Sequence, residues 1–410
     1  PDVTLVSPVF LDDGNSPAFF VANRAHHADV GGISPGSMPA PFFDDGTTRT
    51  LEILDEGFCI GPTMLDDGVR DAFVSASRTP AERLGDLRAQ EAANHVGIQR
   101  LKELAESSFS PEELLALNEA LLDYAEARMR AVIGSIPDGS FTFVDALDSD
   151  GINDNPISIE VTLTVHGDEA VVDFSNSAPS CDSALNAVKA ITLAATYYVF
   201  RCLAPEEMPS SGGIMRPLRV ITRPGSICDA QYPSAVSAGN VETSQRLVDA
   251  LLGALYEFVP KLVPAASCGS MNNVLIGGID SDSETPAWVH YETLAGGCGA
   301  GPSSHGASAL HSHMTNTLNT PIEEMERLFP VLMPCYRIRE TTTGGDTFRG
   351  GRGIERQYQF LRHSTLTLMT ERRRIAPYGL AGGESGQLGE NSLVRATGAT
   401  TPLPGKVACR

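Results

Sequence analysis

The sequence is poor in the features that mark several specialised classes of protein. Its 410 residues carry 30 Lys and Arg against 51 Asp and Glu, which gives a formal charge of −21 at pH 7. An exterior this acidic repels nucleic-acid phosphates and anionic membrane surfaces, so we expect neither nucleic acid nor a membrane among the partners. The longest apolar run, residues 190–200, is too short to span a bilayer and predicts a core helix.

Closely spaced cysteine pairs are also missing. None of the eight cysteines forms a Cys-x-x-Cys pair, the spacing typical of zinc and redox sites, so we expect reduced and mostly buried thiols. We find no secretory leader or membrane anchor and therefore expect a cytoplasmic protein. The hydrophobic share of 42% is that of an ordinary globular protein, and 410 residues are enough for two or three packed units.

Local patterns predict a mixed fold. The chain opens in a strand at 4–10, which turns at 12–14 into a second strand at 18–23. Residues 80–133 have helical periodicity with a break and a new helix start at 110–113, so we expect a helical hairpin. Helices and strands do not alternate regularly enough for a Rossmann sheet or a barrel, so the predicted class is α+β with mixed sheets. Further strands are predicted at 157–165, 170–174, 274–276, 288–294, 357–361 and 366–370, and further helices at 184–203 and 242–258.

A cluster of side chains suited to metal binding follows the second strand. His26, His27 and Asp29 lie within four residues, beside glycines that let the backbone bend around an ion. Manganese, zinc or iron suits nitrogen and oxygen ligands of this kind better than calcium. On an extended backbone His27 and Asp29 face the same way, so they form the stronger ligand pair and His26 becomes a supporting residue. Surface or capping roles are the alternative, because the cluster by itself lacks a further ligand.

A glycine-rich stretch at 296–302 is a second candidate region. Its backbone N–H groups could hold a phosphate or an oxyanion, although the lysine and hydroxyl residue of a Walker loop are missing. Glu292 is a candidate general base, and a carboxylate that faces water or forms a salt bridge is an equal alternative. His305 is a further candidate catalytic residue. His311 and His313 alternate as in a strand and could reach one site, although hydrogen-bonded core or surface histidines are commoner.

Positive charge gathers near the end of the chain, at 349–353 and 370–374. Arginines in such clusters would suit an anionic substrate or intermediate. We favour the alternative that they pair with the many acidic side chains of the protein itself.

These features divide the chain into three expected regions. Residues 1–78 form a strand and loop region with the metal site, 79–150 a helical region, and 151–410 an α+β core with glycine-rich loops.

Taken as a set, the motifs resemble the hydantoinase B and 5-oxoprolinase family along nearly all 410 residues. The resemblance is carried by residues 22–39, 85–90, 172–175, 239–243, 291–293, 296–302, 314–317, 349–351 and 377–380. It implies the hydrolytic subunit, or C-terminal half, of an ATP-dependent cyclic-amide hydrolase. A hydantoinase A-like ATPase subunit, which binds ATP and magnesium, would phosphorylate the ring amide. This chain would then complete the opening of a small lactam such as 5-oxoproline or a hydantoin, within a hetero-oligomer.

The resemblance also implies a larger metal site. Family members carry a Gly-Gly-Thr-His stretch upstream of Pro1 and a glycine-rich tail beyond Arg410, so we expect both ends to be missing here. In the related acetone-type carboxylases the matching positions bind manganese, so Asp2 is expected to join His27 and Asp29 as a ligand of manganese or zinc. A subunit of an ATP-dependent ketone carboxylase is the alternative function. The run 301–317 looks more like 5-oxoprolinase and favours ring opening.

Overall fold

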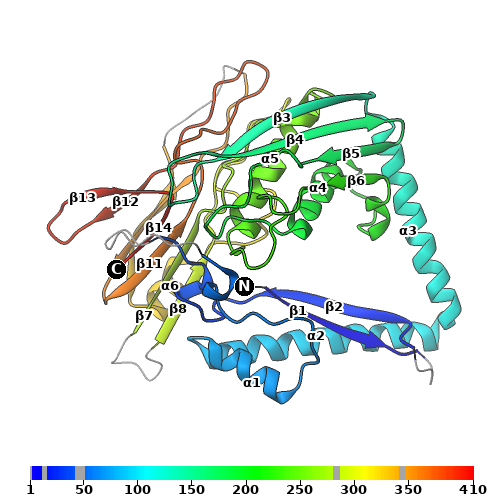
Figure 1. Ribbon diagram of the computed structural model, residues 1–410, viewed down its shortest axis with the longest axis horizontal. Coiled ribbons are helices and arrows are strands. Elements are labelled where there is room, and N and C mark those ends of the chain that lie inside the picture. The colour runs from blue at the N-terminus through cyan, green and yellow to red at the C-terminus, as the bar shows by residue number, and fades with distance from the viewer. Residues whose placement is uncertain (1, 12–15, 42–50, 280–286, 341–346) are drawn as a thin grey trace.

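Two four-stranded sheets form the frame of the molecule (Figure 1). The computed structural model describes residues 2–11, 16–41, 51–279, 287–340 and 347–410. One sheet has the order β3 (Gly139–Leu147), β4 (Ile157–His166), β5 (Glu169–Asp173) and β6 (Leu218–Ile221), antiparallel except that β6 runs parallel to β5. The other has the antiparallel order β14 (Lys406–Cys409), β11 (Ser364–Met369), β7 (Asn273–Ile279) and β8 (Ala287–Glu292). Helices and strands are grouped rather than regularly alternating, which confirms the predicted α+β class.

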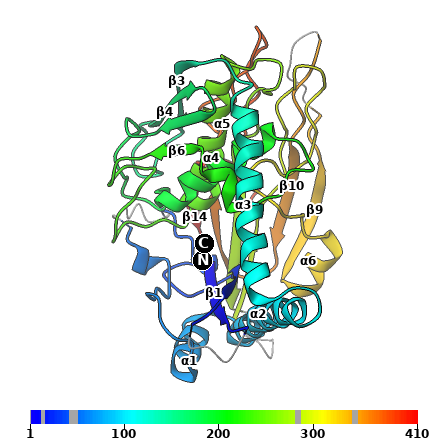
Figure 2. The same ribbon diagram turned by 90° about the vertical axis from the view of Figure 1, so that its right-hand side faces the viewer.

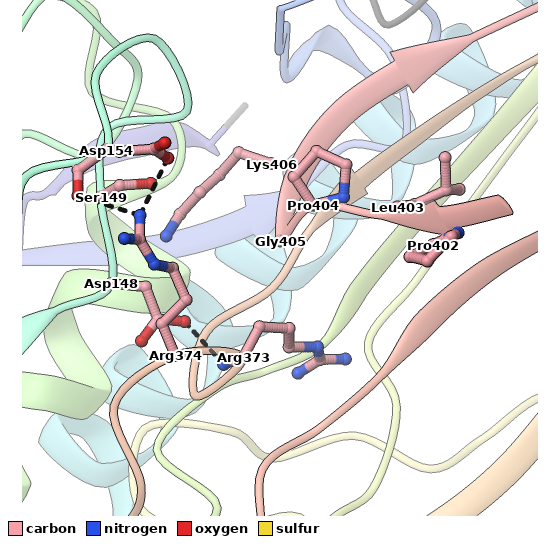
Figure 3. Close-up of a pocket in the computed structure, with 10 residues that line it drawn as sticks. All are labelled: Asp148, Ser149, Asp154, Arg373, Arg374, Pro402, Leu403, Pro404, Gly405 and Lys406. Atoms are coloured by element: carbon pink, nitrogen blue, oxygen red, sulfur yellow. Dashed lines mark hydrogen bonds and ion pairs between the residues drawn. The ribbon is translucent and has the colours of Figure 1, made fainter.

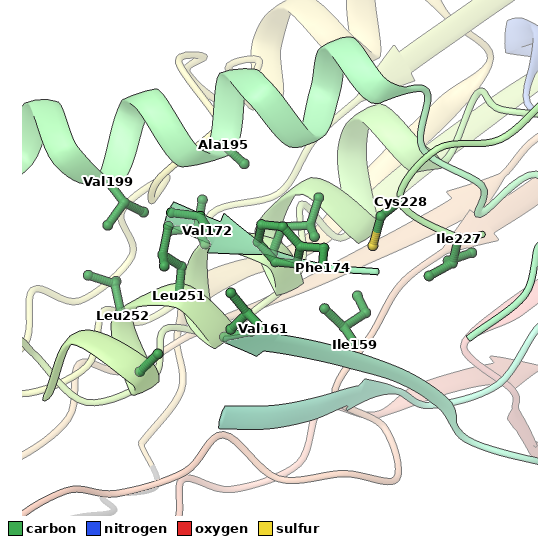
Figure 4. Packing of buried hydrophobic residues seen from close by; sticks show 14 of the residues in the cluster. Ile159, Val161, Val172, Phe174, Ala195, Val199, Ile227, Cys228, Leu251 and Leu252 are labelled. Atoms are coloured by element: carbon green, nitrogen blue, oxygen red, sulfur yellow. The ribbon is translucent and has the colours of Figure 1, made fainter. Parts of the chain in front are cut away.

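The main core lies between the first sheet and two helices, α4 (Lys189–Leu203) and α5 (Ser244–Tyr256). The alternation along β4 turns one set of its side chains inward, including Val161, which is fully buried. Helix α5 packs on β3 and β4, and Gly253 permits the approach because a Cβ there would lie 2.6 Å from the Phe143 ring. Figure 4 shows how side chains of these strands and helices converge. The same buried cluster includes Met38, Met129 and Met369, one from each of the three expected regions.

A long N-terminal hairpin lies beside this frame. Strands β1 (Asp2–Val9) and β2 (Phe19–His26) pair antiparallel and place Asp2 opposite His26. The expected turn at 12–14 lies outside the described residues. Helix α2 (Pro80–Ser107) packs along the hairpin, where the Gln90 side-chain amide donates to the Val3 carbonyl at 3.0 Å. This packing fixes the end of the hairpin that carries Asp2 and His26.

The two long helices run in different directions (Figures 1 and 2). Helix α3 (Pro111–Ile133) begins after Ser110, whose hydroxyl accepts from the Glu113 N–H in a capping box, so the helix break lies where the sequence predicts it. Helix α3 packs on the short η3 (Gly212–Met215), and a Cβ on Gly213 would fall 1.9 Å from the Leu122 carbonyl oxygen. Whereas α2 packs on the N-terminal hairpin, α3 therefore joins the main core.

The remaining elements are short and lie around the frame. Strands β9 and β10 form one hairpin, and β12 and β13 form another at the C-terminal edge (Figure 1). Within the described ranges, every helix is too short or too polar to span a lipid bilayer. The bounds of these elements are η1 (Pro35–Ser37), η2 (Ile53–Asp55), α1 (Asp67–Ala76), η4 (Gly239–Thr243), α6 (Ile322–Leu328), β9 (Val331–Ile338), β10 (Ile354–Phe360), β12 (Asn391–Val394) and β13 (Thr400–Leu403).

Candidate active site

The hairpin register brings Asp2 and His26 together. Residues opposite each other in an antiparallel pair project from the same face, and here His26 Nδ1 lies 2.9 Å from Asp2 Oδ1. The second carboxylate oxygen accepts from Arg24 Nη2 at 3.0 Å and from Asn240 Nδ2 at 3.1 Å. Burial raises the pKa of Asp2, but the hydrogen bond from His26 and the nearby positive charges, of which Arg24 has the smallest effect, together outweigh burial and hold that pKa below its usual range. Asp2 is therefore an ionised acceptor.

The protonation of His26 follows from this pairing. Burial lowers the pKa of His26, although the bond to Asp2 acts in the opposite direction, so the ring is neutral near pH 7. A carboxylate can only accept, so Nδ1 is the donor and Nε2 carries the lone pair. The side chain is 31% exposed, which leaves it within reach of water or a substrate. A histidine held in one tautomer by a carboxylate is suited to accept a proton.

Tyr291 and Asn240 complete the surroundings of this pair. The Tyr291 ring lies 4.8 Å from the His26 ring, centroid to centroid, and its hydroxyl donates to Asn273 Oδ1 at 2.8 Å. Asn240 belongs to η4, a π-helical turn just before α5. Residues 239–243 and 291–293 belong to the motifs that carry the family resemblance, but no role was predicted for Asn240 or Tyr291. Only the motif match could have found them, because both are more than two hundred residues from Asp2.

His27 lies on the other side of the hairpin from this site. It is fully buried, with Nε2 3.0 Å from Gln90 Oε1 and its ring edge-on to Phe73 at 5.1 Å between centroids. Its Nδ1 lies 3.8 Å from Asp86 Oδ2. These contacts attach the end of β2 to α1 and α2.

Asp29 is a fully buried hydrogen-bond centre of the loop that follows β2. Its Oδ1 accepts from the N–H groups of Gly31 and Arg78, at 3.0 and 2.9 Å, and from the Ser77 hydroxyl at 3.3 Å. Its Oδ2 accepts from the Gly36 N–H at 3.1 Å and from Arg78 Nη1 at 2.9 Å. Five donors, one of them a guanidinium, already surround this carboxylate.

The expected ligand set of Asp2, His27 and Asp29 is therefore not assembled. Strand β2 ends at His26, so the alternation that was expected to align His27 with Asp29 does not extend to them. Among the described residues, no three His, Cys, Asp or Glu side chains are grouped as a metal site would require. Asp2 and His26 supply two potential ligands, whereas catalytic zinc sites use three. Manganese or zinc at this place stays a prediction, and we derive no catalytic step through it.

Glu292 and His305 have other surroundings. The Glu292 carboxylate is buried against Arg356, with Nη1 3.0 Å from Oε1, and also accepts from the Thr320 N–H. Burial raises the pKa of Glu292, but the hydrogen bond from His290 and the charge of Arg356 outweigh burial, and the pKa lies below its usual value. Glu292 is therefore an ionised salt-bridge partner rather than a free base. His305 is exposed, and its Nδ1 accepts from the Arg349 N–H at 3.0 Å.

The glycine-rich loop is held by backbone contacts. The N–H groups of Gly296 and Cys298 donate to the carbonyls of Leu310 and Ala307, at 3.1 and 2.9 Å. A Cβ on Gly299 would fall 1.8 Å from the Ala265 carbonyl oxygen. These glycines serve close chain packing, and the two N–H groups are not free to bind an anion.

His313 does not lie on a strand, contrary to the expected alternation. It has a φ of 52°, its Nε2 lies 3.4 Å from Asp249 Oδ1, and its Nδ1 lies 3.3 Å from the Tyr198 hydroxyl. His311 lines a cavity of about 520 Å³ together with Asn316. The two histidines thus have separate surroundings.

The second arginine cluster pairs with the protein's own carboxylates, as we favoured. Arg372 is buried and bonds Asp145 at 2.8 Å and Asp249 at 3.2 Å. Arg374 bonds Asp154 at 2.9 Å and lines a pocket of about 310 Å³ (Figure 3). The close-up shows the Arg373 guanidinium directed away from Asp154 and Ser149.

Comparison with known proteins agrees with this architecture. The family model for hydantoinase B/oxoprolinase matches residues 1–410. An uncharacterized protein of Methanocaldococcus jannaschii is 36% identical over 99% of this chain and 69% of its own length. A 5-oxoprolinase of Dictyostelium discoideum is 37% identical over 97% of this chain but only 30% of its own length.

Among solved structures, the ATP-dependent caprolactamase from Pseudomonas jessenii superposes with a TM-score of 0.86 at 24% identity. The match covers 100% of this chain and 72% of that one, so the two share a fold. Since the family model matches the whole chain, this protein belongs to the hydantoinase B/oxoprolinase family.

Proposed function

We propose that this chain is the hydrolytic part of an ATP-dependent hydrolase of small cyclic amides. The substrate would be 5-oxoproline, a hydantoin or a similar lactam, and a hydantoinase A-like ATPase subunit would phosphorylate the amide with ATP and magnesium in a hetero-oligomer. The observation that carries the proposal is the His26–Asp2 pair in a chain that matches the family model from end to end. The names of two similar proteins, a 5-oxoprolinase and a caprolactamase, support a lactam as the substrate class.

The chemistry assigned to this chain begins after phosphorylation. Amide resonance makes direct attack by water slow, and a phosphoryl group on the amide oxygen removes that resonance. His26 Nε2 accepts a proton from water as the water oxygen adds to the ring carbon. The carbon–nitrogen bond then breaks as His26 returns the proton to the departing ring nitrogen. The hydroxyl on the same carbon loses its proton to solvent and becomes the carbonyl of an acyl phosphate. A second water hydrolyses the resulting acyl phosphate to a carboxylate and phosphate.

Asp2 and Asn240 position the base in this scheme. Asp2 fixes the tautomer of His26 and stabilises the imidazolium that forms when the ring takes up a proton. Asn240 holds the second Asp2 oxygen, so the carboxylate cannot rotate away from the ring.

A substrate panel with the complete enzyme tests the proposal. The full-length chain and its ATPase partner would be assayed with 5-oxoproline, hydantoins and simple lactams, measuring ring-opened product and phosphate together. We expect at least one lactam to be opened only when ATP is present. Lack of lactam turnover, together with entry of labelled bicarbonate into a ketone, would instead establish the carboxylase alternative.

A further inference from the structure

Glu242 stands at the end of a chain of contacts that begins at Asp2. His26 bonds Asp2, Tyr291 lies against His26, and the Tyr291 hydroxyl donates to Asn273 Oδ1. The Asn273 amide nitrogen then donates to Glu242 Oε1 at 2.6 Å. A fully buried carboxyl group is thus connected to the candidate base through two side chains.

A second set of contacts connects the turn that carries Glu242 to Asp2. Glu242 and Asn240 belong to the same π-helical turn, η4, and Asn240 donates directly to Asp2. Single π turns in helices are rare and frequently occur at functional sites. The turn η4 therefore touches the His26–Asp2 pair twice, directly through Asn240 and indirectly through Asn273 and Tyr291.

The positive and negative side chains around Glu242 are equal in number when Glu242 itself is left out. Lys406 bonds Glu371, Arg246 bonds Asp145 and Glu371, and Arg372 bonds Asp145 and Asp249. In this cluster, which is buried except for the half-buried Arg373, four carboxylates face four cationic side chains: Asp145, Asp148, Asp249 and Glu371, with Arg246, Arg372, Arg373 and Lys406. An ionised Glu242 would add a fifth, uncompensated negative charge, which is costly in a buried place.

The immediate neighbours of Glu242 lead to the same protonation state. Glu371 and Arg373 face it from the segment after β11, Lys406 from β14 and Tyr291 from β8. Burial, and next the negative charge of Glu371, raise the pKa of Glu242 to about 8. A hydrogen bond from Ser270 lowers the pKa of Glu242, but it has a smaller effect than burial and Glu371. The Glu242 Oε1 also accepts from the Met271 N–H at 3.2 Å.

We infer that Glu242 is a positioning residue for the His26–Asp2 pair and acts as a neutral carboxylic acid. Its Oε1 fixes the Asn273 amide, Asn273 fixes the Tyr291 hydroxyl, and the Tyr291 ring holds the His26 imidazole in place. The inference rests on the proposed function in so far as His26 is the base. Ionisation of Glu242 would put an uncompensated charge in the cluster and loosen this support.

Three variants of the complete enzyme test the positioning role. Glu242→Ala removes the acceptor for Asn273. We expect kcat for ring opening to fall about tenfold or more with little change in KM, because a small misplacement of a catalytic group slows the chemical step. Glu242→Gln keeps an acceptor oxygen and should restore most of that loss. It should also remove the decline in kcat that we expect in the wild-type enzyme as the pH rises through about 8. Glu257→Gln, at an exposed glutamate just after α5, is the matched control.

The outcomes separate the possible errors. Equal losses in Glu242→Ala and Glu242→Gln would show that an ionised carboxylate is required and would overturn the inference. Full activity in Glu242→Ala would also overturn it, because no positioning role would remain.

One readout does not need lactam turnover. Infrared spectroscopy at pH 7 is best done in a Glu56→Gln background, because Glu56 is a second buried carboxyl group with a raised pKa. There a protonated-carboxyl band should be present in the parent chain, missing when Glu242→Gln is added and present when Glu257→Gln is added. An absent band would contradict the neutral state of Glu242. If the band is present while every lactam fails, the proposed function is wrong and the protonation state stands.

Discussion

Replacement of Asp29 distinguishes its structural contacts from a role as a metal ligand. In Asp29→Asn the side-chain oxygen can keep the three donors of Oδ1, but an NH₂ group then faces the two donors of Oδ2, the Gly36 N–H and Arg78 Nη1. Loss of the charge-assisted bond costs about 2 kcal/mol, and the buried N–H without a partner costs about 1 kcal/mol more. We therefore expect the free energy of unfolding to fall by about 3 kcal/mol, within the range known for broken buried pairs.

Urea unfolding of chelator-treated protein measures this change without any contribution from bound metal. Asp154→Asn is the matched control, because Asp154 is 97% exposed and its pair with Arg374 should contribute less than about 1 kcal/mol. Elemental analysis of the same variants completes the comparison. A metal-free Asp29→Asn protein as stable as the wild type, combined with loss of a stoichiometric ion, would refute the structural role.

Two further predictions concern close packing and buried charge. Gly213→Ala should destabilise the protein by about 2 kcal/mol or more, because the added Cβ would overlap the Leu122 carbonyl. Gly61→Ala is the control, because Gly61 has open space around it and the substitution should leave the stability unchanged. Thermal unfolding of the two variants measures the difference. Burial raises the pKa of Glu56 to about 7, so the native state binds more protons than the unfolded state between pH 4.5 and 7 and stability falls as the pH rises through that window. The new amide side chain in Glu56→Gln can still accept from the N–H groups of Val236 and Ser237 but does not titrate. Between pH 4.5 and 7, the free energy of unfolding of this variant relative to the wild type should therefore rise by about 1.4 kcal/mol per pH unit, as measured by urea unfolding. A difference that stays constant with pH would contradict this prediction.

Much of the fold could be predicted from local patterns. Strand β4 alternates strictly between buried and partly exposed positions, and α3 begins with the Ser110 capping box, so period and cap chemistry identified both elements. The four-residue strands β6, β12, β13 and β14 were not predicted, because four residues carry too little periodicity to be distinguished from a loop. The longer strands β3 and β9 were also not predicted, and β3 lies in the region 79–150 that was expected to be helical.

The candidate site was less predictable, because long-range contacts decide it. The cluster at 26–29 was found from spacing, but the end of β2 at His26 sends His27 and Asp29 into different surroundings. Asn240 reaches Asp2 across 238 positions, and Arg356 reaches Glu292 across 64, which no local spacing indicates. The sequence pattern therefore identified the region around His26. The tertiary structure decides which side chains meet there, namely His26 and Asp2 rather than His27 and Asp29.

The proposed division of labour between this chain and an ATPase partner is tested most directly at His26. In a single-turnover experiment, the complete enzyme carrying His26→Ala would be mixed with lactam and ATP, and phosphate transfer and ring opening would be followed separately. His166→Ala, at a histidine whose side chain is 94% exposed, is the control. We predict that phosphate transfer to the lactam continues while ring opening slows about a hundredfold or more, the range for loss of a general base. Ring opening at the wild-type rate in His26→Ala would contradict the central claim.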